Sequence, residues 1–194
     1  MKKLFLSAAT LVAAVAPSAA HAQAIPAAVI AVVDLERVTS QCNACKTATT
    51  ALRSQVTGLQ NREKTLSAPL ETEGKAIQTA IAALNGKDPD AALQARVRAF
   101  EQKRQQGAQE ISRQQQQIQR NQQYIQQQIA TKLGPIYQQV MQRRGATVLL
   151  ETGSTLASSS STDVTNDVLA ALNTALPTIA TTAPAQAQQT PPGR

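Results

Sequence analysis

The feature that most constrains this chain is a pair of matching heptad patterns separated by one turn. The first pattern advances in alternating steps of four and three through Leu52, Val56, Leu59, Glu63, Leu66, Leu70, Glu73, Ile77, Ala80 and Leu84. The second keeps the same steps through Leu93, Val97, Phe100, Arg104, Gly107, Ile111, Gln114, Ile118, Asn121 and Ile125. Steps of this kind mark the packing seam of a helix. Two seams around one turn predict an antiparallel coiled-coil hairpin over residues 42–144.

The turn at residues 85–90 carries the residues that end one helix and begin the next. Gly86 suits the left-handed conformation that closes a helix. Asp88 is expected to cap the second helix, with Pro89 at its first position and Asp90 adding a favourable negative charge. Each limb then has roughly 45 to 55 residues, so at about 1.5 Å per residue the arm is roughly 65 to 80 Å long.

Pairing the limbs downward from this tip predicts a specific register. The expected partners are Leu84 with Leu93, Ala80 with Val97, Ile77 with Phe100, Leu66 with Ile111, Leu59 with Ile118, and Leu52 with Ile125. The same register predicts an ion pair between Glu73 and Arg104. It also sets Leu70 opposite Gly107, next to Pro69. Because an interior proline removes a helical hydrogen bond at a cost of about 3 kcal/mol, Pro69 and Gly107 are expected to form a hinge.

The first 22 residues have the pattern of a secretory signal peptide. Two lysines precede a short apolar run, and Ala20-His21-Ala22 provides a small-x-small cleavage site, with Ala24 as the alternative. The apolar run is too short to span a bilayer. Cleavage would remove His21, the single histidine, which excludes Ser-His-Asp and Cys-His catalytic centres and histidine zinc sites. We therefore expect a secreted protein that is not an enzyme and needs no cofactor or metal.

Positive charge is concentrated in the predicted arm. Residues 42–144 contain 15 basic and 7 acidic residues, a net charge of +8, whereas the rest of the chain after residue 22 has 2 basic and 5 acidic residues. Such a surface favours acidic partners, such as acidic polypeptides and anionic lipid or lipopolysaccharide surfaces. Aromatic side chains are scarce and tryptophan is absent, which argues against binding of nucleic acid by base stacking.

The flanking segments predict a small β body at the root of the arm, formed by residues 23–41 and 145–177. Residues 29–33, 146–150 and 155–159 are each expected to form a short strand. Thr165 is expected to cap a short helix that ends before Pro177. Residues 178–194, rich in Ala, Thr, Gln and Pro, are expected to be disordered. The fold class is thus α+β, with a sheet small enough to need pairing with other copies.

Two cysteines, Cys42 and Cys45, lie where the body passes into the first limb. Cysteines spaced i, i+3 at a helix start are close enough to form a disulfide, and the helix end would lower the pKa of the first thiol. One interpretation is a thioredoxin-like exchange centre, and the other is a local disulfide or unreactive thiols. The second is favoured because no βαβ pattern accompanies the motif.

The order of these elements resembles the Skp, or OmpH-like, family of periplasmic chaperones. The resemblance is carried by VIAVVDLERV at residues 29–38, the helical hairpin, and ATVLLETGSTLASSSSTDVTNDVLAALN at residues 146–173. It implies a homotrimer whose strands form a small β-barrel, with arms enclosing a cavity that holds unfolded outer-membrane proteins without ATP. The many glutamines between Gln102 and Gln128, and the cysteine pair, depart from the family's usual pattern.

The sequence therefore predicts a periplasmic holdase that captures clients by many weak contacts. Expected client-binding residues are the apolar Leu59, Ile77, Phe100, Ile111 and Ile118, each of which is equally a seam residue, and the basic Arg96, Arg98, Lys103 and Arg104. Two alternatives remain. One is a structural or tethering coiled-coil envelope protein, and the other is a thiol-disulfide oxidoreductase centred on the cysteine pair.

Overall fold

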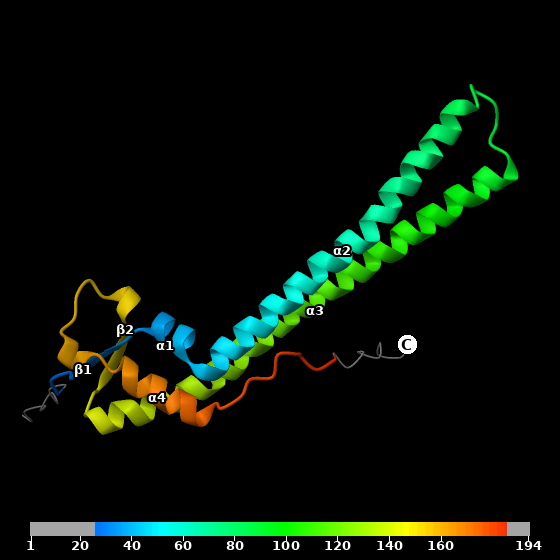
Figure 1. Ribbon diagram of the computed structural model, residues 1–194. Helices are drawn as coiled ribbons and strands as arrows, with labels where there is room; N and C mark the ends of the chain where they lie inside the picture. The colour runs from blue at the N-terminus through cyan, green and yellow to red at the C-terminus, as the bar shows by residue number, and fades with distance from the viewer. Residues whose placement is uncertain (1–25, 186–194) are drawn as a thin grey trace, which may run out of the picture.

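A long helical hairpin projects from a small body in the computed structural model of the protein, which describes residues 26–185 (Figure 1). The elements in chain order are β1 (Ile30–Val33), α1 (Leu35–Gln41), α2 (Asn43–Ala83), α3 (Ala91–Arg144), β2 (Val148–Glu151), two short 3-10 turns (Thr152–Ser154 and Ser160–Thr162) and α4 (Thr165–Ala175). The predicted signal peptide, residues 1–22, lies outside the described residues, as do residues 186–194.

The predicted antiparallel hairpin is confirmed. Helices α2 and α3 run side by side from the body to a shared tip (Figure 1). All but three of the predicted seam positions are at least partly buried, the exceptions being Val56, Glu63 and Arg104. The heptad steps therefore identified the two helix faces that meet.

The tip differs from the prediction at the start of α3. Asn85 and Gly86 both have positive φ, 47° and 86°, so the expected left-handed glycine is present. The predicted cap, Asp88, is wrong: Asp90 accepts a hydrogen bond from the Leu93 N–H at 2.7 Å and caps α3 instead. Asp90 has the extended backbone of a cap residue, with φ −70° and ψ 170°, so α3 begins at Ala91, two residues later than predicted.

The register in the outer half of the arm is also not the predicted one. Glu73 pairs with Arg96, at 2.6 Å, and not with Arg104, which pairs with Glu101 on its own helix. The Phe100 ring lies over Gly74, where an added Cβ would be 3.5 Å from the ring edge. A glycine leaves room for a large ring, and this fit favours a register that the heptad pattern alone did not specify.

Gly107 likewise lies closer to the root than predicted. An added Cβ there would meet Leu66 at 3.8 Å, so Leu66 is its nearest side chain and not Leu70. Near the root the predicted register fits better, because Leu52 and Ile125 line one hollow between the limbs.

The body is built around a parallel pair of strands. β1 and β2 pair with Ile30 opposite Val148 and Val33 opposite Glu151. One hydrophobic cluster joins β1, α1, the first turn of α2, the last turns of α3, and α4: Ala31, Val33, Val38, Cys42, Ala44, Cys45, Leu133, Ile136, Val140, Val164, Val168, Leu172 and Leu176. The core thus extends into the end of α3, which the sequence assigned to the arm.

The predicted third strand, residues 155–159, is wrong. This segment is irregular between the two 3-10 turns, and β1 gains only an isolated bridge from Val32 to Asp163. Local hydroxyls bond the nearby backbone instead: Ser154 donates to the Glu151 carbonyl at 2.8 Å and Thr162 to the Ser159 carbonyl at 2.7 Å. Side chains of this type compete with strand pairing for backbone partners.

Helix α1 was not anticipated, and the start of α4 differs from the prediction. Asp34 ends β1 and caps α1 by accepting from the Arg37 N–H at 2.8 Å. Thr165 does not cap α4: its hydroxyl accepts from the Asp34 N–H at 2.9 Å, and Asp163 accepts from the Thr165 N–H at 2.8 Å. Thr165, fully buried, thereby ties the start of α4 to the end of β1.

Several large apolar side chains of the body face solvent in the single chain. Val29 and Ile30 are about half exposed, Leu150 is 37% exposed, and Leu156 is fully exposed. Val29, Ile30 and Leu150 lie on or next to the strands of a sheet that has two strands among residues 26–185, with edges that are largely unpaired there. Among residues 26–185, no helix has the length and apolar character needed to cross a membrane.

Candidate functional site

The five apolar residues predicted to bind clients all lie in or beside the α2–α3 seam. Ile77 is buried, and the others are partly buried: Leu59, Phe100, Ile111 and Ile118. Two helices alone cover only one side of each seam residue, so part of each partly buried side chain stays accessible. The seam therefore offers a discontinuous apolar surface along the arm.

The four predicted basic residues are all exposed, but they differ in their partners. Arg96 holds Glu73 through two hydrogen bonds, and Arg104 does the same with Glu101. The hydrogen bond from Arg96 lowers the pKa of Glu73, with a further contribution from the charge of Lys103. Arg98 and Lys103 make no ion pair within the described chain. These two cations are therefore the more available for an acidic partner.

A hollow of about 490 Å³ opens beside the predicted hinge, at the level of Pro69 and Gly107. At the edge of this hollow, Arg62 of α2 forms an ion pair with Glu110 of α3 at 2.6 Å. The hydrogen bond from Arg62 lowers the pKa of the Glu110 carboxyl. Helix α2 is continuous through Pro69. The two predicted hinge residues thus line one hollow of the arm, and bending there stays a prediction.

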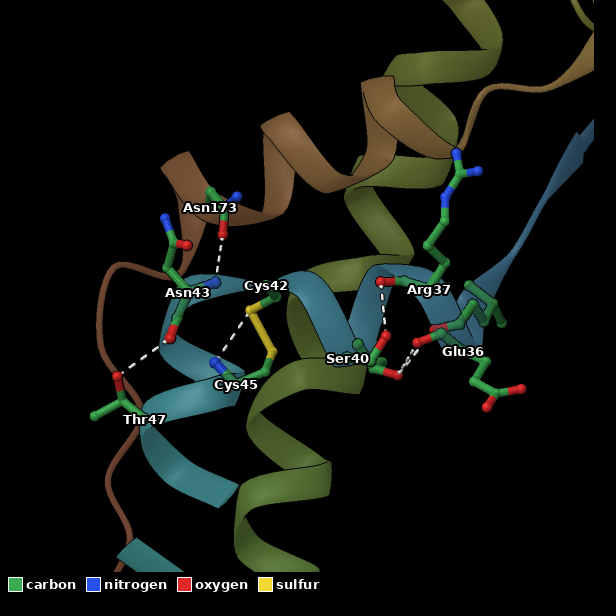
Figure 2. Close-up of a disulfide and its surroundings, with 10 residues drawn as sticks. Glu36, Arg37, Ser40, Cys42, Asn43, Cys45, Thr47 and Asn173 are labelled. Carbon is green, nitrogen blue, oxygen red and sulfur yellow. Dashed lines mark hydrogen bonds between the residues drawn. A yellow bond between two sulfur atoms is a disulfide. The ribbon is translucent and has the colours of Figure 1, made fainter. Parts of the chain in front are cut away.

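The two cysteine sulfurs are joined in a disulfide at the corner between α1 and α2 (Figure 2). The Cα atoms are 5.1 Å apart, and the Cys45 N–H points to the Cys42 sulfur at 3.2 Å. Cys42 is fully buried and Cys45 is 3% exposed, both within the core of the body. Thiol exchange requires attack on an accessible sulfur, so this bridge has the features of a structural disulfide.

Helix α4 holds the same corner from the other side. The Asn173 side chain accepts a hydrogen bond from the Asn43 N–H at 2.9 Å, at the first residue of α2 (Figure 2). The free N–H groups at a helix start need such partners, and here the partner comes from 130 residues away in the chain. The disulfide and this bond together fix the direction in which α2 leaves the body.

Sequence reasoning missed the segment that follows α4 and contacts the base of the hairpin. The prediction of disorder is wrong for residues 178–185, which leave α4 and run along the base of the hairpin (Figure 1). They are held by side-chain amides of Gln55, Asn121 and Gln128. The unusual number of glutamines in α3 was the only sequence signal for this contact.

Comparison with known proteins agrees with this architecture. The family model for outer membrane protein (OmpH-like) matches residues 29–172. A solved structure of a candidate outer membrane chaperone (OmpH-like) from Caulobacter crescentus CB15 is similar with a TM-score of 0.67. That likeness covers 84% of this chain and 96% of the other at 17% sequence identity, which establishes a shared fold. No curated protein matches the sequence.

Proposed function

Because the chain belongs to the OmpH-like outer membrane protein family, we propose that it is a periplasmic holdase chaperone. It binds unfolded outer-membrane β-barrel proteins without ATP and keeps them from aggregating. The observation that carries this proposal is the arm itself: two long helices with a net positive charge and an apolar seam that stays partly uncovered along most of its length. Such a surface suits many weak contacts with a disordered chain.

The proposal includes assembly into a homotrimer. Exposed Val29, Ile30, Leu150 and Leu156 support it, because an apolar surface beside an unfinished sheet is expected to be covered by other copies. Strands from three chains would then complete a small barrel, and three arms would surround one client. Trimerisation would also raise the local concentration of binding surface.

The alternatives receive less support. A thiol-disulfide oxidoreductase would need an accessible sulfur, whereas Cys42 and Cys45 are buried. A tethering coiled coil would not need its seam to be incompletely covered or its arm to be the basic part of the chain. The predicted contact with anionic lipid or lipopolysaccharide rests on the same positive charge and is kept as a secondary proposal.

The test is an aggregation assay on an outer-membrane β-barrel diluted from urea, with the mass of the free protein measured by analytical ultracentrifugation. We expect light scattering to be suppressed at about one trimer per client, and a sedimenting species of three chains. A folded monomer at micromolar concentration would contradict the trimer, and undiminished scattering would contradict the chaperone function.

The charge of the arm allows a sharper version of this test. Arg98→Gln with Lys103→Gln should slow client association at low salt, because unpaired charges steer encounter and are screened within about 8 Å at physiological ionic strength. The matched control is Lys132→Gln with Arg143→Gln, which removes the same charge from exposed positions near the root. Equal association rates for both variants would show that the arm's cations do not steer clients.

A further inference from the structure

The segment that follows α4, residues 177–185, has no regular secondary structure and is bound to the arm through its backbone N–H and C=O groups. It leaves the end of α4 and lies alongside the base of α2 and α3 (Figure 1). Leu176 is buried and Ile179 packs against the core of the body, which fixes the start of the segment. Beyond Ile179, hydrogen bonds to amide side chains hold it.

Gln128 makes the most complete of these contacts. Its side-chain oxygen accepts from the Ala180 N–H at 3.0 Å, and its side-chain nitrogen donates to the Ala180 carbonyl at 2.9 Å. A residue of one strand makes the same pair of bonds with a residue opposite it in an antiparallel sheet. Gln128 thus stands in for the backbone of a neighbouring strand.

Two more amides continue this contact along the segment. Gln55 of α2 donates to the Thr181 carbonyl at 3.2 Å, and Asn121 of α3 accepts from the Ala183 N–H at 2.8 Å. All four bonds reach backbone atoms of the segment, and no side chain of residues 180–183 donates or accepts a hydrogen bond in the described structure. Recognition of this kind depends on extended backbone and not on sequence.

The amides are ordered by bonds among themselves. Asn121, only 3% exposed, donates to the Gln55 side-chain oxygen at 2.8 Å and accepts from the Gln117 side chain at 2.7 Å. Gln128 donates separately to the Tyr124 carbonyl at 3.2 Å, and polar side chains that have several partners keep a fixed geometry. The row of side-chain amides of Gln55, Asn121 and Gln128, which we call the amide groove, therefore needs little rearrangement to bind a peptide backbone.

We propose that the amide groove is a binding site for extended polypeptide backbone, and that residues 177–185 occupy it until an extended segment of an unfolded client displaces them. This inference rests on the proposed chaperone function for the identity of the client. An unfolded outer-membrane protein suits such a site, because its strand-forming segments are extended and offer the same N–H and C=O groups. The chain's own segment is short and uncharged, so a client that gains seam and charge contacts as well competes with it effectively.

The experiment weakens the binding of residues 177–185 and leaves the side chains of the amide groove unchanged. Ala180→Pro with Ala183→Pro removes the two N–H groups that donate hydrogen bonds to the side-chain oxygens of Gln128 and Asn121. Thr182→Pro is the matched control, because the Thr182 N–H makes no hydrogen bond among residues 26–185. The probe is a fluorescein-labelled peptide with the sequence of residues 178–185, added to the full-length protein and followed by anisotropy.

The double proline variant should bind the labelled peptide about tenfold more tightly than the parent, since two net hydrogen bonds no longer favour the internal competitor. The control should bind like the parent. Adding Gln128→Ala to the double proline variant should remove most of this gain, whereas Gln123→Ala, at an exposed position on the same helix, should not. Equal peptide affinity in parent and double proline variant, or a gain that survives Gln128→Ala, would overturn the proposal.

Hydrogen exchange with an unfolded outer-membrane protein supplies the second readout. The Ala180 and Ala183 amides should be protected in the free protein and should lose protection when the client binds. If the client is kept soluble while both amides stay protected, the chaperone function stands and the amide groove is not its binding site. If the client aggregates although the labelled peptide still exchanges into the groove, the proposed function fails and the groove remains a strand-binding site.

Discussion

The body and the outer arm use the same apolar residue types but bury them to different depths. In the body, Val38, Val140, Val168 and Leu172 are fully buried because α1, α3, α4 and β1 cover them from several sides. Between residues 56 and 118 only Ile77 and Gly107 are buried, and 6% of the Ile77 surface is still exposed. The difference teaches that a two-helix layer cannot enclose a core, however regular its heptads are.

The comparison predicts its largest effect when one apolar side chain is truncated in each region. Leu172→Ala should lower the free energy of unfolding by about 3 to 4 kcal/mol, and Ile118→Ala in the arm by only about 1 kcal/mol, because a partly exposed side chain leaves a smaller cavity. Urea denaturation followed by circular dichroism measures both. Equal losses would mean that the arm seam is packed as tightly as the body.

The second test asks whether the predicted flexibility of the arm arises at Pro69 and Gly107. Pro69→Ala with Gly107→Ala should restore a hydrogen bond and raise helix propensity, stabilising the arm by roughly 1 to 4 kcal/mol. The added Cβ on Gly107 would lie 3.8 Å from Leu66, an ordinary contact. In the proposed trimer, the distances between spin labels attached at Lys87→Cys of each chain, in a background without the native cysteines, should become more narrowly distributed. An unchanged distribution would place the flexibility elsewhere.

The third test removes the disulfide from the body. Cys42→Ala with Cys45→Ala should cost roughly 2 kcal/mol, because the bridge closes a loop of only a few residues and constrains the unfolded chain little. Hydrogen exchange should rise at the start of α2 and in α1, while the outer arm stays as in the parent. A rise that spread along all of α2 would show that the two regions unfold together.

The smallest expected effect comes from acid. The pKa values of Glu73 and Glu110 are lowered by their arginine partners, so the stabilisation they give is present above the ordinary glutamate pKa of about 4.3 and is lost as the pH falls through the folded values. Both pairs are exposed, and the loss should therefore be slight. Hydrogen exchange in the outer arm below about pH 4 should increase in the parent.

The control for the acid effect is Glu73→Gln with Glu110→Gln, in which the outer arm should show no added change over the same pH range. The body also contains a carboxyl group of lowered pKa, because the hydrogen bond from Thr165 lowers the pKa of Asp163. Weakening of the body in both proteins is thus expected and does not bear on the arm. An arm response that persists in the control variant would exclude the two ion pairs as its cause.

The heptad steps predicted the hairpin because burial on a helix repeats with a fixed period. They did not predict the register, which depends on single fits such as the Phe100 ring over Gly74 and on the reach of Arg96 to Glu73. Sequence periodicity also did not predict that residues 178–185 bind the arm. This segment has no apolar period, and its amide partners lie 52 to 126 residues away. The many glutamines of α3 were a signal of amide contacts, but they do not indicate which backbone segment the amides bind.

The disulfide-bonded corner has a mechanical consequence. Helix α2 has 41 residues. At about 1.5 Å per residue, its far end lies roughly 60 Å from Cys42, and a rotation of about 5° at the corner would move that end by roughly 5 Å. A small rotation at this corner is therefore amplified at the tip of the arm. The Cys42–Cys45 bridge, which spans one helical turn, limits that rotation. In the proposed trimer, the volume between the arms would be set at their base, by side chains that need not contact the client.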